Sequence, residues 1–323
     1  VRQEQKEVTS MKTRCYELTD KEWELIRPLI PISHTGRPQK DIRAHLNDIM
    51  WLARSGARWS DFPARFGPHQ TVYSCFCRRR DDGTLKKIFE VCAAPSTGAE
   101  LRLDSTSIKA SVQAGRGIES EQNQTSSSIG KTRGGLNTKI HAIVGKDLRP
   151  VAFLLSAGNV DDCTEAVPLL NLLPDLKNCN ILADKAYAQK DQAYLHDQPA
   201  NYTIPPKVNT KQPWLFDKET YKRRNVIERF FNRLKKSRRA ETRYDKRDDS
   251  FLAFVMVAAS CVAFGILHIK EALIESSAVD GERLFVKQGL KNGGILYVLP
   301  IFRTAGLAEK IRRLQSEIYS EVP

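Results

Sequence analysis

The sequence lacks any regular spacing of cysteines. Its 323 residues include seven cysteines, an odd number, and they are scattered along the chain. Only Cys75 and Cys77 lie close together, and no second pair completes a four-ligand zinc site. We therefore expect neither a disulfide framework nor a structural zinc site, and we predict that both cysteines lie on a helix face. This usage suits a reducing compartment, so we expect a cytoplasmic protein.

Long uncharged runs are also scarce. Residues 251–269 hold no Asp, Glu, Lys or Arg, and the run is long enough to span a bilayer. It contains Ser260, Gly265 and His268, however, and it lacks the tryptophan and tyrosine belts of a membrane helix. We predict a buried core helix and no membrane partner. The polar, charged segment 1–10 does not resemble a secretory signal, and we expect it to be disordered.

Acidic residues are the minority among the charged ones. Asp and Glu total 38, against 51 Lys and Arg, which gives a formal net charge of +13. A surplus of this size favours a polyanionic partner, with nucleic acid ahead of an anionic membrane surface. The charge says nothing about the sequence of such a nucleic acid.

The first hundred residues have the pattern of a small helical domain. Thr19 or Asp20 is suited to cap a first helix. Apolar residues at helical spacing predict three more helices, over residues 42–55, 71–80 and 85–93. Short helices with basic ends suit a helix-turn-helix-like module, and a plain helical subdomain is equally compatible. We place this N-terminal domain at residues 11–93 and a linker at 94–100.

After residue 100 the pattern becomes that of a sheet flanked by helices. Apolar runs predict five strands, at 101–104, 137–144, 150–155, 180–184 and 202–205. Helices are predicted up to residue 173, over 189–197, and from Asp217 onwards. A hairpin followed by strand–helix units indicates an α/β fold with a mixed sheet. We assign residues 101–269 to this domain and 270–323 to a C-terminal extension with a helical stretch at 305–319.

Three acids fall at informative places in this order. Asp104 lies on the first strand, Asp184 ends the fourth strand, and Glu228 lies on the last helix. Carboxylates that converge repel one another unless cations neutralise them. Oxygen-only ligands select hard divalent ions, chiefly Mg²⁺ or Mn²⁺. Two such ions can stabilise the attacking and leaving oxygens of an in-line phosphoryl displacement.

The segment 221–235 is predicted to be one amphipathic helix. Its apolar stripe consists of Val226, Ile227, Phe230, Phe231 and Leu234. A second set of side chains projects from one side of it: Tyr221, Arg224, Glu228 and Lys235. Taken alone, this set is most simply a solvated salt-bridge face. The two upstream acids favour a functional face instead. Beside them, we expect Lys235, Lys236, Arg238 and Arg239 to contact a DNA backbone.

Four motifs in this chain resemble those of one protein family. They are Leu-Arg-Leu-Asp-Ser-Thr at 101–106, the segment 129–141, Leu-Ala-Asp-Lys-Ala-Tyr at 182–187, and Tyr-x2-Arg-x3-Glu-x6-Lys at 221–235. The chain resembles the DDE transposases of bacterial insertion sequences, in insertion-sequence family five and close to family four. The matches cover roughly residues 18–264 in the family's order.

The resemblance implies a ribonuclease H-like catalytic domain with Asp104, Asp184 and Glu228 as metal ligands. It implies two Mg²⁺ or Mn²⁺ ions, hydrolysis at the element's end, and attack of the freed 3′-hydroxyl on target DNA. The N-terminal helices would bind terminal inverted repeats of double-stranded DNA, and a homo-oligomer at the nucleoid would hold two ends. The residues expected to contact DNA are Tyr221, Arg224, Lys235, Arg133, Lys139, Arg78, Arg79 and Arg80.

The chain also departs from the family pattern. The link from residue 85 to Asp104 is short, Ala186 replaces the usual glycine, and residues 270–323 extend beyond the usual end. Two alternatives to a transposase follow: a catalytically inactive, transposase-derived DNA-binding protein, and a metal-dependent nuclease of the same fold that cuts without joining.

Overall fold

The structure is a computed structural model that describes residues 17–31, 41–93, 98–115, 128–188, 200–211, 213–279, 283–288 and 297–302. The chain divides into two compact units, Val1–Phe264 and Gly265–Pro323. In the second unit β8 (Arg283–Gln288) pairs antiparallel with β9 (Tyr297–Phe302). The predictions for residues 1–10, 189–197 and 305–319 fall outside the described residues.

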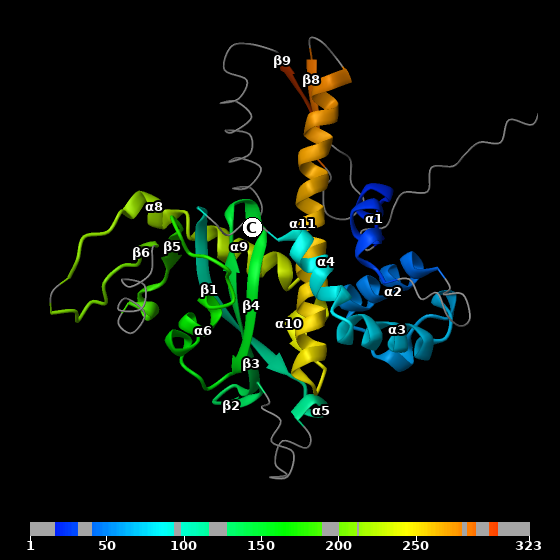
Figure 1. The fold of residues 1–323 in the computed structure, drawn as a ribbon, viewed down its shortest axis with the longest axis horizontal. Coiled ribbons are helices and arrows are strands. Elements are labelled where there is room, and N and C mark those ends of the chain that lie inside the picture. Colours follow the sequence, from blue (N-terminus) through cyan, green and yellow to red (C-terminus); the bar gives the residue numbers. More distant parts are fainter. Residues whose placement is uncertain are drawn as a thin grey trace, which may run out of the picture. The chain divides into compact units, whose positions relative to one another are not determined.

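The predicted N-terminal helices are confirmed (Figure 1). They are α1 (Asp20–Ile26), α2 (Ile42–Ser55), α3 (His69–Asp81) and α4 (Thr84–Cys92), with short 3-10 turns at η1 (Arg27–Leu29), η2 (Trp59–Asp61) and η3 (Ala64–Phe66). Thr19 and Glu22 form a capping box that starts α1. Asp41 caps α2, which ends at Gly56 in the left-handed conformation that glycine tolerates best.

A seven-stranded mixed sheet forms the centre of the first unit. Its strands are β1 (Glu100–Ala110), β2 (Gly130–Thr132), β3 (Gly135–Val144), β4 (Pro150–Ala157), β5 (Asn180–Ala183), β6 (Asn201–Thr203) and β7 (Thr242–Arg243). β4, β3, β1, β5 and β6 lie side by side in that order. β3 is antiparallel to β1 and β4, whereas β5 and β6 run parallel to β1. The predicted mixed sheet is confirmed; the short strands β2 and β7 were not predicted.

Helices cover both faces of the sheet (Figure 1). Those that pack on it are α6 (Ala166–Leu170), α9 (Asn225–Leu234) and α10 (Arg238–Glu241). The unit also contains α5 (Val112–Gly115), α8 (Lys218–Lys222) and the 3-10 turns η4 (Lys146–Leu148), η5 (Asp162–Thr164) and η6 (Lys185–Tyr187). The single helix predicted up to residue 173 is wrong in length: the structure has the turn η5 followed by α6, which ends at Leu170. Pro168 has no N–H to donate to the Thr164 carbonyl, so η5 and α6 do not merge into one helix.

Helix α11 (Asp248–Val279) contains the uncharged run. Its stretch Asp248–Gly265 is the one helical segment among the described residues that is long and apolar enough to cross a membrane, and 61% of it is buried inside the protein. Phe254 stacks on Phe76 of α3 with ring centroids 4.4 Å apart. The side chains up to Phe264 thus form a core between the helical module and the sheet, as predicted.

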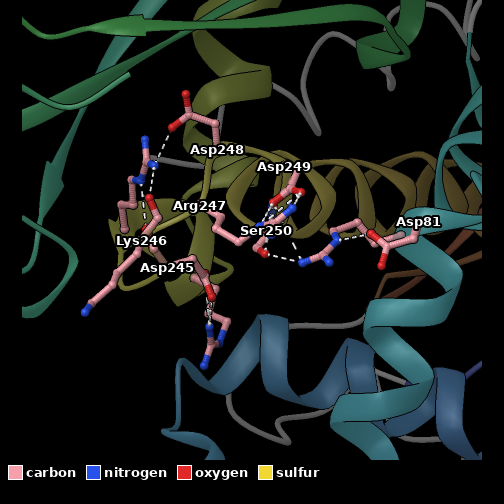
Figure 2. A network of polar contacts seen from close by, with 10 residues as sticks. Asp81, Asp245, Lys246, Arg247, Asp248, Asp249 and Ser250 are labelled. Atoms are coloured by element: carbon pink, nitrogen blue, oxygen red, sulfur yellow. Dashed lines mark hydrogen bonds and ion pairs between the residues drawn. The ribbon is translucent and has the colours of Figure 1, made fainter. Parts of the chain in front are cut away.

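Buried arginines join the module to the sheet domain. Arg239 lies 3.1 Å from both carboxylate oxygens of Asp245 and donates to the Ala57 carbonyl at 3.0 Å. Arg243 pairs with Asp248 and donates to Thr138 Oγ1 of β3 at 2.9 Å. Arg80 of α3 donates to Ser250 Oγ. Figure 2 shows the polar contacts of residues 245–250. We call the contacts of Arg80, Arg239 and Arg243 the joint network. Because Arg239 is 3% exposed, the DNA-backbone contact expected for it is wrong.

Candidate active site

Two carboxylates meet on neighbouring strands. β1 and β5 run parallel, and Leu103 lies opposite Ala183 in their register. Asp104 and Asp184 each come one residue later, so both lie on the same face, at the carboxyl end of β5. Adjacent strands are about 4.8 Å apart, which brings the two acids within reach of one cation. Each carboxylate accepts a hydrogen bond from the backbone N–H of the next residue, at 2.8 and 2.7 Å.

The third acid is joined to the first by a single guanidinium. Arg224 donates through Nη1 to Asp104 Oδ2 at 2.7 Å and through Nη2 to Glu228 Oε1. The side chain of Arg224 is 17% exposed, that of Asp104 22% and that of Glu228 51%. The planar fork of arginine therefore holds two carboxylates from separate elements in one fixed relation.

Tyr221 connects Asp184 to the same cluster. Its hydroxyl donates a 3.4 Å hydrogen bond to Asp184 Oδ1, and the Arg224 Cζ lies 5.8 Å from the centre of its ring. The structure thus brings together five of the residues predicted from the sequence: Asp104, Asp184, Tyr221, Arg224 and Glu228. We call these five residues the acidic cluster.

The element that carries this cluster is not the single helix that was predicted. α8 ends at Lys222 and α9 begins at Asn225, so Arg224 lies at the junction of two helices. Asn disfavours helix interiors, and Asn225 was the available sequence signal for the break. Lys235 follows α9 as its C-terminal cap residue.

The apolar stripe of α9 fixes Glu228 against the sheet. Ile227, Phe230 and Leu234 are fully buried, and Phe230 stacks on Phe153 of β4 with centroids 6.0 Å apart. Burial of each such side chain stabilises the fold by about 1.5–3 kcal/mol. Phe153 pairs with Ala142, which itself lies opposite Asp104, so the stripe packs on the face that carries the acids. The predicted burial is confirmed for Phe230 and Leu234, whereas Val226, also predicted in the stripe, is only partly buried.

The electrostatics of the cluster favour a cation. Burial raises the pKa of Asp104 above its ordinary value, and the nearby charge of Asp184 raises it further. The Ser105 N–H and the Arg224 guanidinium oppose this shift. Within the described parts of the chain, no three His, Cys, Asp or Glu side chains lie close enough together to hold a metal ion. As the side chains lie, Asp104 and Glu228 share an arginine.

Two family models together match most of the helical module and the sheet domain. Residues 98–262, about half of the chain, match the family model "Transposase DDE domain", and residues 18–89 match "Putative transposase of IS4/5 family". The chain belongs to the DDE transposases of the IS4/5 family. Members of this family generally use divalent metal ions.

Two relatives and one solved structure illustrate the similarity of this transposase. The "Putative transposase for insertion sequence element IS6501" of Brucella ovis is 32% identical over 130 residues, which is 39% of this chain and 98% of that protein. The "Uncharacterized protein y4sN" of Sinorhizobium fredii is 35% identical over 98 residues, 30% of this chain and 78% of the relative. The piggyBac transposase synaptic complex with hairpin DNA has a TM-score of 0.46 and 12% identity, with 83% and 76% of the two chains covered.

Three of the transposase's predicted DNA contacts lie outside the acidic cluster or at its border. Lys235 is half-buried at the end of α9. Arg133 is exposed in the turn between β2 and β3. Lys139 pairs with Ser107, an odd number of residues from Asp104, and so faces the opposite side of the sheet. It donates to the Val160 carbonyl at 2.7 Å and pairs with Asp162 at 2.9 Å, so it holds a loop there.

The three consecutive arginines of α3 have different surroundings. Arg78 is exposed. Arg79 is 2% exposed and lies 3.2 Å from Asp82. Arg80 donates to Ser250 Oγ at 2.6 Å, in the joint network of Figure 2. Of the three, only Arg78 is exposed to solvent, although the same DNA contact was predicted for all of them.

Sequence reasoning missed a second arginine behind the cluster. Arg102 is 2% exposed and donates to the Arg223 carbonyl at the α8–α9 junction, at 3.2 Å. Glu100 bridges both arginines, with Arg223 at 2.7 Å. Arg102 precedes Asp104 by two residues and therefore lies on the same face. That spacing was the signal that could have revealed its role in placing the junction.

Proposed function

We propose that this transposase binds the ends of an insertion-sequence DNA and catalyses divalent-metal-dependent cleavage and strand transfer. Asp104, Asp184 and Glu228 are the proposed metal ligands. The observation that carries the proposal is the acidic cluster: two acids side by side on β1 and β5, and a third tied to the first through Arg224.

The donor set fits a hard divalent ion. All three acids offer only oxygen, and no sulfur or imidazole ligand belongs to the cluster. A bound pair of Mg²⁺ or Mn²⁺ ions would stabilise the attacking and leaving oxygens of an in-line phosphoryl transfer. The protein's part is to fix the carboxylates. β1 and β5 hold Asp104 and Asp184 in register, and the buried stripe of α9 holds Glu228.

DNA binding is proposed for two surfaces. Tyr221, Arg224 and Lys235 would contact phosphates next to the acids. On the helical module, the exposed side chains Gln70, Ser74 and Arg78 recur every four residues along α3. Glutamine, serine and arginine are side-chain types that read base edges in the major groove. An open hollow beside them is lined by no Asp or Glu. We propose α3 as the helix that reads the inverted repeats.

The test compares Asp184→Asn with the wild type and with Asp161→Asn, which changes an exposed acid outside the cluster. Purified proteins are given labelled duplexes that carry the element's ends, a target plasmid and Mg²⁺. We expect Asp184→Asn to lose joined products and to retain binding of the end duplex, while Asp161→Asn keeps both. Unchanged strand transfer by Asp184→Asn would contradict the assignment.

The same assay separates the alternatives. An inactive descendant is favoured by one observation, the arginine-bound state of Asp104 and Glu228, and it would bind the ends without cutting them in any metal. A plain nuclease would cut without joining. We further propose that two copies assemble on two DNA ends in the cytoplasm. Analytical ultracentrifugation with and without end duplex would show a protein dimer or larger assembly in the complex.

A further inference from the structure

Arg224 makes contacts that a simple DNA-contacting arginine does not need. Both of its terminal nitrogens are directed at carboxylates of the acidic cluster, Asp104 on β1 and Glu228 on α9. The side chain is mostly buried, and the Tyr221 ring lies beside it. In this arrangement each terminal nitrogen already donates to a carboxylate, so a phosphate bound in the two-pronged manner that arginine favours would have to share both nitrogens with the two acids.

The carboxylate oxygens that Arg224 occupies belong to two of the three proposed metal ligands. The three acids carry a charge of −3, and Arg224 reduces it to −2. Two divalent ions would add +4, and a guanidinium held at hydrogen-bonding distance from the same oxygens would then be repelled. The Arg224 guanidinium and divalent metal ions would therefore compete for the carboxylates of Asp104 and Glu228.

The position of the cluster permits such an exchange. Glu228 is about half exposed, and its bond to Arg224 spans one turn at the start of α9 rather than the protein core. Arg224 lies at the α8–α9 junction, where its backbone is outside both helices. The Arg224–Glu228 contact is therefore open to solvent on the Glu228 side, whereas Arg224 and Asp104 are mostly buried, so a cation that replaces the guanidinium has to take over its contact with Asp104.

We propose that Arg224 is a positioning residue that occupies Asp104 and Glu228 before metal binds, and that divalent ions displace it from them. The released guanidinium is then free to bind a DNA phosphate. This inference rests on the proposed metal-dependent function and adds an order of events: metal entry frees the arginine that holds DNA.

The test measures Mn²⁺ binding without DNA, by electron paramagnetic resonance of free Mn²⁺ in titrations at constant pH. Variants are Arg224→Gln, Arg224→Lys and, as a matched control, Arg223→Gln, which removes the neighbouring charge from Glu100 instead. We expect Arg224→Gln to bind Mn²⁺ about tenfold more tightly than the wild type because a competing cation is gone. Lysine cannot bind both acids at once, so the Mn²⁺ affinity of Arg224→Lys should lie between those of the wild type and Arg224→Gln. Arg223→Gln should change the Mn²⁺ affinity less than twofold.

Unchanged or weaker Mn²⁺ binding by Arg224→Gln would overturn the exchange. Asp184→Asn in the same titration separates this failure from that of the proposed function. If the wild type binds Mn²⁺ and Asp184→Asn does not, the metal site stands whatever Arg224 does. If Asp184→Asn binds Mn²⁺ as the wild type does, the proposed metal site is wrong. Circular dichroism and thermal unfolding establish whether each variant is folded. If Arg224→Gln does not fold, the Mn²⁺ affinity of Arg224→Lys decides the test.

Discussion

The acidic cluster and the joint network use the same chemistry, arginine paired with carboxylate, in opposite surroundings. In the cluster, Arg224 pairs with Glu228, which is 51% exposed. In the joint network, Arg243 is fully buried and Arg239 is 3% exposed. A buried pair that loses one partner leaves an unpaired charge away from water, whereas a half-exposed pair can open. The comparison teaches that exposure, more than pairing, separates a structural arginine from one that can act.

The arginines of the joint network also have more fixed hydrogen-bond acceptors than Arg224 has in the acidic cluster. Arg243 donates to the carbonyls of Asp245 and Lys246 as well as to Thr138, so nearly every donor has a fixed acceptor. Arg239 lies 4.5 Å from the centre of the Phe254 ring. Arg224 has two carboxylates and one ring beside it. The contacts of Arg239 with Ala57 and of Arg80 with Ser250 therefore hold the helical module on the sheet domain, whereas Arg224 is a partly exposed arginine that two carboxylates share.

The largest predicted effect is on chemistry at the cluster. Asp104→Asn should reduce strand transfer by at least about 10³-fold, which corresponds to about 4 kcal/mol of lost transition-state stabilisation. Quantified joined products in a single-turnover assay give the rate. Urea unfolding should change little, because asparagine keeps the shape of the side chain and an oxygen that can accept from Arg224 and the Ser105 N–H. A variant that keeps its rate within tenfold would show that Asp104 is not a metal ligand.

The next effect is on stability at the joint network. Arg243→Met should lower the free energy of unfolding by about 3–5 kcal/mol, because it leaves Asp248 without its buried partner. Arg224→Gln, the matched change in the cluster, should lower it by about 1 kcal/mol or less. Urea denaturation followed by circular dichroism measures both. Equal losses in the two variants would break the comparison between the two clusters.

A smaller effect concerns the arginine run of α3. Arg78→Ala should weaken binding of the end duplex by about 1–3 kcal/mol and leave thermal stability unchanged, since its side chain is exposed. Arg80→Ala should lower thermal stability through its lost contacts with Ser250 and Asp249. Fluorescence anisotropy and thermal unfolding separate the two. The assignment of α3 fails if Arg78→Ala binds the duplex as tightly as the wild type.

The smallest effect comes from a buried acid whose described surroundings provide no ion pair. Burial, with some repulsion from Asp41, raises the pKa of Asp48 to about 6. Its charged form therefore costs stability above pH 6, and the cost falls as the pH drops from 6 towards 4, where the unfolded chain also takes up the proton. Asp48→Asn should therefore raise the free energy of unfolding by roughly 1–2 kcal/mol at pH 7.5 and by much less at pH 4.5, as measured by urea denaturation at the two pH values. An equal gain at both pH values would contradict this origin.

The sequence was a good guide to the sheet and the acids, because both depend on local patterns. Apolar runs marked β1, β3, β4 and β5, and the motif around each acid placed Asp104 and Asp184 at adjacent strand positions. The stripe of α9 was equally legible. These features follow from side-chain periodicity, which survives without knowledge of tertiary contacts.

The roles of individual arginines were not legible, because they depend on partners far along the chain. Arg239 meets Ala57, and Arg80 meets Ser250. Nothing local distinguishes buried Arg79 from exposed Arg78. The break between α8 and α9 was missed for a related reason. Arg102, more than a hundred residues earlier in the chain, donates a hydrogen bond to the backbone carbonyl of Arg223 at this junction. Local helical propensity did not reveal that contact.

The most direct test of the metal-ligand assignment is the metal preference of Asp184→Cys. A thiolate is a poor ligand for Mg²⁺ and a better one for Mn²⁺, so a ligand position converted to cysteine should change which metal supports the reaction. If Asp184 is a metal ligand, Asp184→Cys should form no joined product in Mg²⁺ and regain strand transfer in Mn²⁺, while the wild type is active with both metals. Full activity in Mg²⁺, or no recovery in Mn²⁺ by a folded, DNA-binding Asp184→Cys protein, would contradict it.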